Sequence, residues 1–263
     1  MGKLFAAWLF VLICLSCGAA GAQGLHEREI GTKVTGAFTL GSKTFYVPEG
    51  DWTLVAKHQW NSLVASYRVG SPMAGVLLLE IRDSRLSRGV LVQTNLQVNM
   101  GTNWSNDPCR TDDSLQYQKQ LGPSYQNQFC VEVRHLVNFL SGGTGWVEPA
   151  YRWALENKIA VPYTVLRVFL ARVDDKDDDL ISYYFNPEVD GFAPAVIPQR
   201  AANEWHRERI KADPARLAYV QNLAQWGEAI AATVLAGISR RGDLHAAILR
   251  APYPLQEYRS RPN

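Results

Sequence analysis

The sequence is poor in cysteine, has almost no excess of either charge, and contains no apolar run long enough to cross a bilayer. Four cysteines in 263 residues are too few for a disulfide-dense scaffold. The 27 basic and 25 acidic residues nearly cancel, so the chain lacks the positive field with which proteins attract nucleic acid. We therefore exclude nucleic acid as the main partner. A composition of 47% hydrophobic and 20% charged residues is typical of a globular protein.

The first 22 residues have the pattern of a secretory signal peptide. Lys3 precedes an apolar run at residues 4–15, and a tract of small residues follows. The small side chains of Ala20 and Ala22 suit a signal peptidase, which predicts cleavage after Ala22. Twelve apolar residues are fewer than the ~20 of a membrane span. We expect a periplasmic or secreted protein with no transmembrane segment after cleavage.

A lipid anchor is the alternative for the leader. Residues 15–18, Leu-Ser-Cys-Gly, loosely resemble a bacterial lipobox, in which the cysteine carries the lipid. Cys14 stands where that motif prefers leucine. Attachment of a lipid at Cys17 is therefore kept as a second hypothesis beside cleavage after Ala22.

Export determines how the other cysteines are interpreted. Once Cys14 and Cys17 have left with the leader, Cys109 and Cys130 are the only pair in the chain. Two thiols in an oxidising compartment, with no third cysteine left unpaired, predict one disulfide. A redox-active pair would be close in sequence, as in Cys-x-x-Cys, and these two are not.

Apolar periodicity predicts strands through most of the chain and two helices. The expected strands and hairpins cover residues 33–47, 51–58, 75–83, 89–98, 129–139, 163–173 and 180–185, and the expected helices cover residues 146–157 and 214–239. Residues 100–128 are polar and aperiodic, and predict a long loop. The fold class that follows is α+β, a mostly antiparallel β-sheet packed against a long C-terminal helix and a shorter middle helix.

The chain after the leader shows no internal repeat and no sharp change of composition. One α+β domain over residues 23–250 is therefore the simplest organisation. Three prolines and several charges after Ala251 predict a flexible tail at residues 251–263.

An aspartate-rich segment, "VDDKDDDL", lies between two predicted strands. Asp175, Asp177 and Asp179 have the spacing with which a calcium loop begins, but Leu180 replaces its glycine and Asn186 its final glutamate. An EF-hand is therefore excluded, and an exposed hairpin tip is the expected structure. We expect neither a metal site nor a cofactor.

Histidines and tryptophans are the remaining candidates for a site. His58 and His135 fall on otherwise apolar faces of predicted strands, where a histidine either belongs to the core or serves as a base or ligand group. His206 is expected on a solvated helix face. Trp146 and Trp153 flank the apolar stripe of the middle helix, where they either widen the core or stack on a sugar or apolar ligand.

The sequence carries no local nucleophile or phosphate-loop motif after the leader. The first hypothesis is therefore a non-enzymatic exported protein of the bacterial envelope that binds a protein partner or a small ligand. The alternative is a periplasmic hydrolase assembled from separated residues, with His135 or His58 as base. A third is a membrane-active protein that uses the long helix at residues 214–239. Whether the protein is an enzyme is left open.

Overall fold

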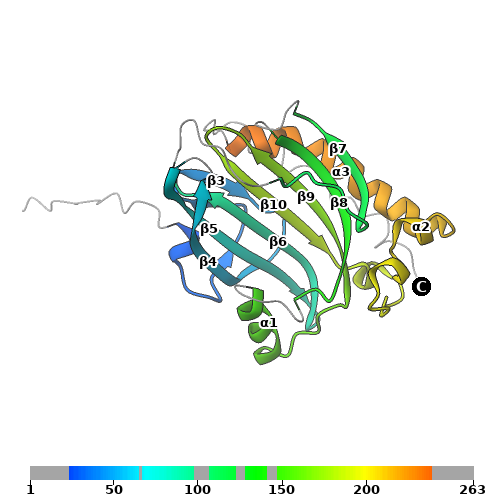
Figure 1. Ribbon diagram of the computed structural model, residues 1–263. Helices are drawn as coiled ribbons and strands as arrows, with labels where there is room; N and C mark the ends of the chain where they lie inside the picture. Colours follow the sequence, from blue (N-terminus) through cyan, green and yellow to red (C-terminus); the bar gives the residue numbers. More distant parts are fainter. Residues whose placement is uncertain (1–23, 65–66, 98–106, 123–127, 141–146, 239–263) are drawn as a thin grey trace, which may run out of the picture.

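The computed structural model describes residues 24–64, 67–97, 107–122, 128–140 and 147–238, which fold around a curved antiparallel sheet (Figure 1). In spatial order, its strands are β1 (Lys33–Val34), β4 (Trp52–Val64), β5 (Tyr67–Arg82), β6 (Arg85–Asn95), β10 (Asp178–Phe185), β9 (Thr164–Val173), β8 (Gln128–Val137) and β7 (Leu115–Gln120). The predicted signal peptide with Cys17, the predicted tail and Trp146 lie outside the described residues.

Helices cover the sheet on two faces, and a separate hairpin adds to one of them. The remaining elements are η1 (Leu25–Glu27), β2 (Ala37–Leu40), β3 (Lys43–Tyr46), α1 (Val147–Glu156), η2 (Pro187–Asp190), η3 (Arg200–Ala202), α2 (Arg207–Ile210) and α3 (Pro214–Ile238). The long helix α3 packs on β8, β9 and β3, and the shorter α1 packs on β4. The predicted fold class is therefore confirmed.

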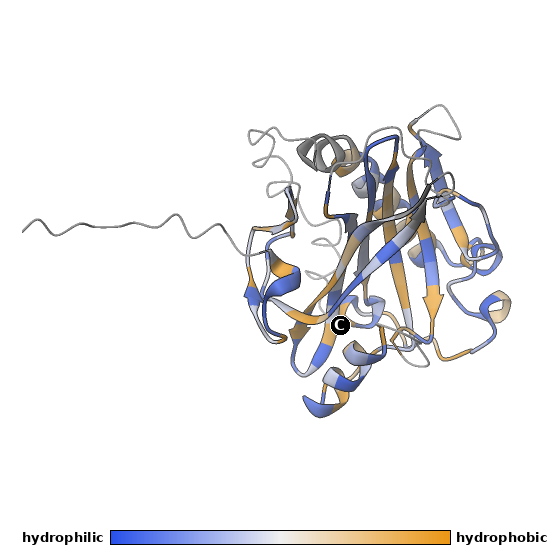
Figure 2. Cartoon of the chain, turned by 60° about the vertical axis from the view of Figure 1, so that its left-hand side comes forward, coloured by the Kyte–Doolittle hydropathy of each residue, from blue (hydrophilic) through white to orange (hydrophobic). Residues whose placement is uncertain are grey.

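The central strands are buried on both faces. On β9, Val168 and Leu170 belong to the core under α3, while Val165 belongs to the core under α1. Phe169 and Ala171 also point away from α3, into a small cluster around the disulfide. A strand with two buried faces shows no polar alternation, which explains the nearly continuous apolar run of the sequence at this point. Figure 2 shows the same apolar bands along the middle of the sheet.

Asp213 caps the N-terminus of the long helix, which begins at residue 214 as the sequence predicts. Asp213 Oδ1 accepts hydrogen bonds from the backbone N–H groups of Ala215 and Arg216, both at 3.1 Å. Farther along the helix, Gly227 lies directly against the sheet, because a Cβ there would stand 2.8 Å from a methyl carbon of Val168. The missing side chain therefore sets how closely α3 approaches β9.

The middle helix packs through its small residues. Ala150 and Ala154 are fully buried against the second face of the sheet. Pro149 lies in the first turn, where the proline ring costs the helix no hydrogen bond. Because α1 has only ten residues, it covers only part of that face.

Two expectations about the strands are wrong: the loop expected at residues 100–128 and the face of the sheet on which His58 lies. The polar segment predicted as a loop contains β7, which pairs with β8 at the edge of the sheet. Strand β4 carries a register shift between Leu54 and Ala56, so Leu54 faces α3 while Val55 and Ala56 both join the opposite core. The irregularity moves His58 to the face opposite Leu54, because successive side chains alternate after the bulge.

The expectation for His206 is also wrong. Its side chain is buried, and its Nδ1 caps the short helix α2 by accepting a hydrogen bond from the backbone N–H of Glu208 at 3.3 Å. Among the helices of the described residues, none is both long enough and apolar enough to span a membrane.

The close contact at Gly227 predicts a loss of stability on a conservative change. Gly227→Ala should lower the free energy of unfolding by about 1–2 kcal/mol, because overpacking against Val168 outweighs the gain of about 1 kcal/mol in helix propensity. Urea denaturation followed by circular dichroism measures the change. Gln225→Ala, at an exposed position of the same helix, is the matched control and should not destabilise. A Gly227→Ala protein as stable as that control would contradict the packing argument.

Candidate functional site

The aspartate-rich segment forms the turn between β9 and β10, as predicted. Asp174 organises this turn, because its Oδ1 accepts hydrogen bonds from the backbone N–H groups of Lys176 at 2.9 Å and Asp177 at 2.8 Å. Its Oδ2 lies 2.8 Å from Nη2 of Arg172. This end of the hairpin is therefore held by its own side chains.

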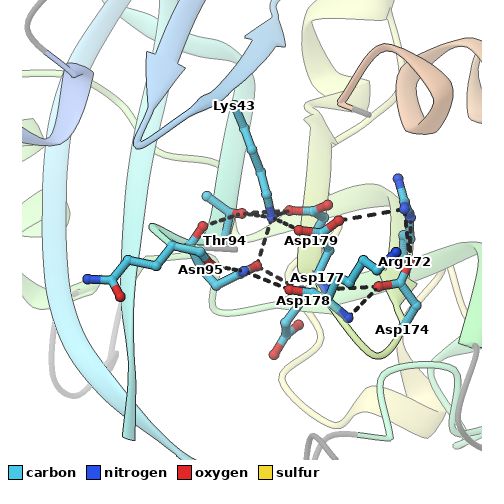
Figure 3. Close-up of polar contacts among 10 residues, drawn as sticks. Lys43, Thr94, Asn95, Arg172, Asp174, Asp177, Asp178 and Asp179 are labelled. Carbon is cyan, nitrogen blue, oxygen red and sulfur yellow. Dashed lines mark hydrogen bonds and ion pairs between the residues drawn. The ribbon is translucent and has the colours of Figure 1, made fainter. Parts of the chain in front are cut away.

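The expectation of a solvated tip is wrong for Asp178 and Asp179, which are fully buried. The ammonium of Lys43, from β3, lies among the acidic groups (Figure 3). Its Nζ is 2.6 Å from Oδ1 of Asp179 and 2.9 Å from Oδ1 of Asp177. It also donates to Oδ1 of Asn95 at 2.7 Å. The ammonium of Lys43 thus forms ion pairs with two of the carboxylates, those of Asp177 and Asp179.

The Lys43 network joins three strands that are distant in sequence. Thr94 on β6 receives a further hydrogen bond from Lys43 at 2.9 Å and donates to Asp179 on β10 at 2.5 Å. Burial raises the pKa of Asp179, and the charge and hydrogen bonds of Lys43 act against that rise. The network fastens β3 to β6 and β10, and we assign it a structural role.

The two candidate histidines lie on opposite faces of the sheet and do not meet. His135 is fully buried, with Nε2 3.2 Å from the carbonyl oxygen of Arg200 and its ring edge-on to His206 at 5.7 Å between centroids. Burial lowers the pKa of His135. His58 is exposed and stacks on Trp60, with 5.4 Å between ring centroids.

Trp153, the described member of the candidate tryptophan pair, is half-buried on α1. It packs against the core under that helix and also lines a shallow hollow of about 680 Å³ beside the short edge strand β1. Lys33 and Asn157 line the same hollow. Neither His58 nor His135 lines this hollow beside β1.

A different hollow, of about 540 Å³, lies on the sheet face away from α3, beside the part that α1 covers. We call it the sheet-face hollow. Its lining consists of Trp60, Ser62, Met73, Leu91, Gln93, Asp107, Pro108, Arg110, Asp112, Arg134, Arg167, Phe169, Asp178, Leu180 and Ser182. Six strands (β4, β5, β6, β8, β9 and β10) and one loop therefore build it, and neither His58 nor His135 is in the lining.

Strand register arranges the lining as rows across the sheet. The row nearest α1 contains Arg134 and Arg167, with Tyr184 beside them outside the lining. The next row contains Phe169, Ser182 and Leu91, with Glu132 beside them outside the lining. Leu180 and Gln93 follow, and Asp178, Met73 and Trp60 form the farthest row. The charged groups Arg134 and Arg167 thus gather at one end, while the apolar side chains of Leu180, Met73 and Trp60 gather toward the other.

The loop over the hollow is held by the Cys109–Cys130 disulfide, which confirms the predicted pairing. A second tie comes from Arg134, whose Nη2 donates to the carbonyl oxygen of Arg110 at 2.5 Å. Its Nη1 lies 2.5 Å from Oδ2 of Asp112. The wall of the hollow is therefore fixed both covalently and by ion pairing.

Arg134 is fully matched with carboxylates. Besides Asp112, it pairs through Nε with Oε2 of Glu132 at 2.7 Å. Burial alone would lower the pKa of Arg134, but the hydrogen bonds and charges of Glu132 and Asp112 raise it. Burial likewise opposes ionisation of Asp112, yet hydrogen bonds from Ser114 and the charge of Arg134 hold its pKa below the usual value.

Arg167, directly opposite Arg134 on β9, is different. Within the described residues it forms no ion pair, and its Nε is buried without a hydrogen-bond partner. The guanidinium carbon lies 4.7 Å from the centroid of the Phe169 ring. Burial lowers the pKa of Arg167, and the charge of Arg134 acts in the same direction, whereas Tyr184, Glu132 and Asp112 act against it.

Sequence reasoning missed the sheet-face hollow. A signal was present in the sequence, because Arg167 is a charged residue within the apolar run of β9. Its significance depends on what lies across the sheet, and that is set by strand order.

Neither protein-family models, nor curated proteins, nor solved structures provide a match to this chain. Over the described ranges, no cluster of three or more His, Cys, Asp or Glu side chains could hold a metal ion.

The buried Lys43 network predicts a large and pH-dependent loss of stability. Lys43→Met should lower the free energy of unfolding by about 3–5 kcal/mol at neutral pH, because Asp179 is left as a buried charge without its partner. The loss should shrink as the pH falls, since the pKa of Asp179 is already raised and the carboxylate then takes up a proton. Urea titrations at several pH values measure both effects.

Lys211→Met removes an exposed lysine from a surface ion pair with Glu208 and serves as the control. It should leave stability unchanged at every pH. A Lys43→Met loss that stays constant between neutral and acidic pH would show that packing, rather than the stranded carboxylate, is responsible.

Proposed function

We propose that the chain is an exported binding protein of the bacterial cell envelope, and that its ligand is a small molecule held in the sheet-face hollow. The sequence pattern of the leader supports export. The Cys109–Cys130 disulfide is consistent with an oxidising compartment. Binding is the activity proposed for the hollow.

The observation that carries the proposal is a rigidly walled hollow over the middle of the sheet. The other face of the same strands is filled by the core under α3. At the sheet-face hollow, about 540 Å³ is left open, within the range of small-molecule sites. Because the disulfide and Arg134 hold the wall, little ordering is needed when a ligand enters.

The hollow combines the two kinds of surface that small-molecule sites use. Phe169, Leu91 and Met73 offer apolar contact, while Arg167 and Ser182 offer polar groups for orientation. The hydrolase hypothesis remains a prediction, and the lining lends it no support because His135 and His58 lie outside it.

Binding can be tested with two fluorescent probes of the same skeleton, anilinonaphthalene sulfonate and neutral N-phenylnaphthylamine. At least one should bind the purified protein saturably with one-to-one stoichiometry. Gln93→Trp, which places a large ring in the sheet-face hollow, should abolish that binding. Asn157→Trp fills the separate hollow beside α1 and should leave it intact.

Each variant must first show the circular dichroism spectrum and cooperative melting of the unmodified protein. Absence of saturable binding by both probes, or equal binding by the Gln93→Trp and unmodified proteins, would refute the proposed site.

The disulfide should matter for both stability and binding. Replacing Cys109 and Cys130 together by serine removes a link across 21 residues and should cost roughly 3 kcal/mol of unfolding free energy. Because the loop then relies on Arg134 alone, affinity for whichever probe binds should fall severalfold even where the protein is fully folded. Unchanged affinity in the folded double variant would show that the wall does not contribute to the site.

A further inference from the structure

Arg167 occupies an electrostatically unfavourable position. On the sheet it stands directly opposite Arg134 on β8 and Tyr184 on β10. Like charges at directly opposed positions of an antiparallel pair repel each other, because their Cβ atoms are only about 4.5–5.5 Å apart. The carboxylates nearby, Glu132 and Asp112, both pair with Arg134. The two arginines and two carboxylates balance in number, but both carboxylates are engaged by Arg134, so Arg167 is left without an ion pair of its own in the described part of the chain.

Other arginines in the sheet have their positive charge balanced by an ion pair with a carboxylate. Arg88 holds Glu80 with two hydrogen bonds, of 2.6 and 2.7 Å. Arg172 holds Asp174 at 2.8 Å. Arg167 has no carboxylate partner among the described residues: its guanidinium interacts with Tyr184 and the Phe169 ring, and its Nε is buried without a hydrogen bond. Removing a guanidinium from water without a counter-ion is unfavourable, and the chain retains the residue nonetheless.

Within the described residues, no acidic group of the hollow forms an ion pair with Arg167. Asp178 is six positions from Tyr184 along β10, and Tyr184 is the residue paired with Arg167. At about 3.3 Å per residue, that places Asp178 roughly 20 Å away along the strand. Asp112 is held by Arg134 and Ser114. Asp178 is therefore too far away to pair with Arg167, and the two nearer carboxylates, Glu132 and Asp112, are held by Arg134.

The surface beside Arg167 is apolar. Phe169 lies two residues along β9 and contacts the guanidinium with its ring. Leu91 shares the row of Phe169, and Leu180 lies in the row beyond. A ligand with its charge at Arg167 would therefore lay an apolar body over these side chains.

We propose that the ligand is a small organic anion, an inference that rests on the proposed function. Its carboxylate, sulfonate or phosphate group pairs with Arg167. Its ring or chain packs on Phe169, Leu91 and Leu180. Arginine presents a planar fork of N–H donors that matches such groups. The volume of about 540 Å³ restricts the ligand to a small molecule. Arg167 is the residue that determines specificity for an anion.

The two probes separate the anion from the apolar body, because they differ only in the sulfonate. Arg167→Met keeps much of the side-chain volume and removes the charge. It should weaken anilinonaphthalene sulfonate about tenfold or more, as loss of a hydrogen bond to a charged group does, and leave N-phenylnaphthylamine within about twofold. Arg152→Met, which removes an exposed arginine of α1, controls for general electrostatic attraction and should change neither affinity.

Arg167→Lys keeps the charge and should retain part of the preference for the sulfonate. Without ligand, Arg167→Met should melt at the same temperature as the unmodified protein or higher, because an uncompensated charge has been removed. A markedly lower midpoint for Arg167→Met would show that Arg167 is a structural residue and would overturn the inference.

Two results would show that Arg167 does not recognise the anionic group. In one, Arg167→Met and Arg167→Lys each change the affinities for both probes by the same factor, and in the other they leave both affinities unchanged. The binding proposal would still stand provided Gln93→Trp blocks the probes. If no probe binds at all, both the anion site and the proposed function fail together.

Discussion

A sheet whose central strands are apolar on both faces must be covered on both, and this requirement organises the whole protein. The 25-residue helix α3 supplies one cover and approaches closely because Gly227 has no side chain. The ten-residue helix α1 is too short to supply the other. A loop linked to the sheet by Cys109–Cys130 covers a further part. The sheet-face hollow lies on the part of this face that α1 leaves uncovered, and the loop forms its wall.

Buried charged side chains join the small hairpin and the disulfide-linked loop to the main sheet. Lys43 and Asp179 join the small hairpin to the main sheet, and Arg134 joins the loop to β8. In each case hydrogen bonds and an opposite charge offset the cost of removing the group from water. Arg167 departs from this pattern, and it does so inside the hollow. An electrostatic exception at a concave surface is where a ligand would restore the pattern.

Local patterns predicted much of the fold. The hairpin within residues 33–47, the start of the long helix at residue 214 and the pairing of Cys109 with Cys130 each depend on nearby residues or on a simple count, and the structure agrees with all three. Strand β7 was missed because its polar residues lie at an edge, where alternation is weak. His58 was placed on the wrong face because a bulge in β4 leaves no trace in the apolar pattern.

The sequence by itself determined which segments become strands and helices, since backbone preference and apolar periodicity act over a few residues. It also determined that two cysteines would pair. Only the tertiary structure decided that Asp179 would meet Lys43, 136 positions away, and that Arg167 would stand opposite Arg134. Strand order and register fix which side chains become neighbours, and no local pattern encodes them. The candidate site is made entirely of such neighbours.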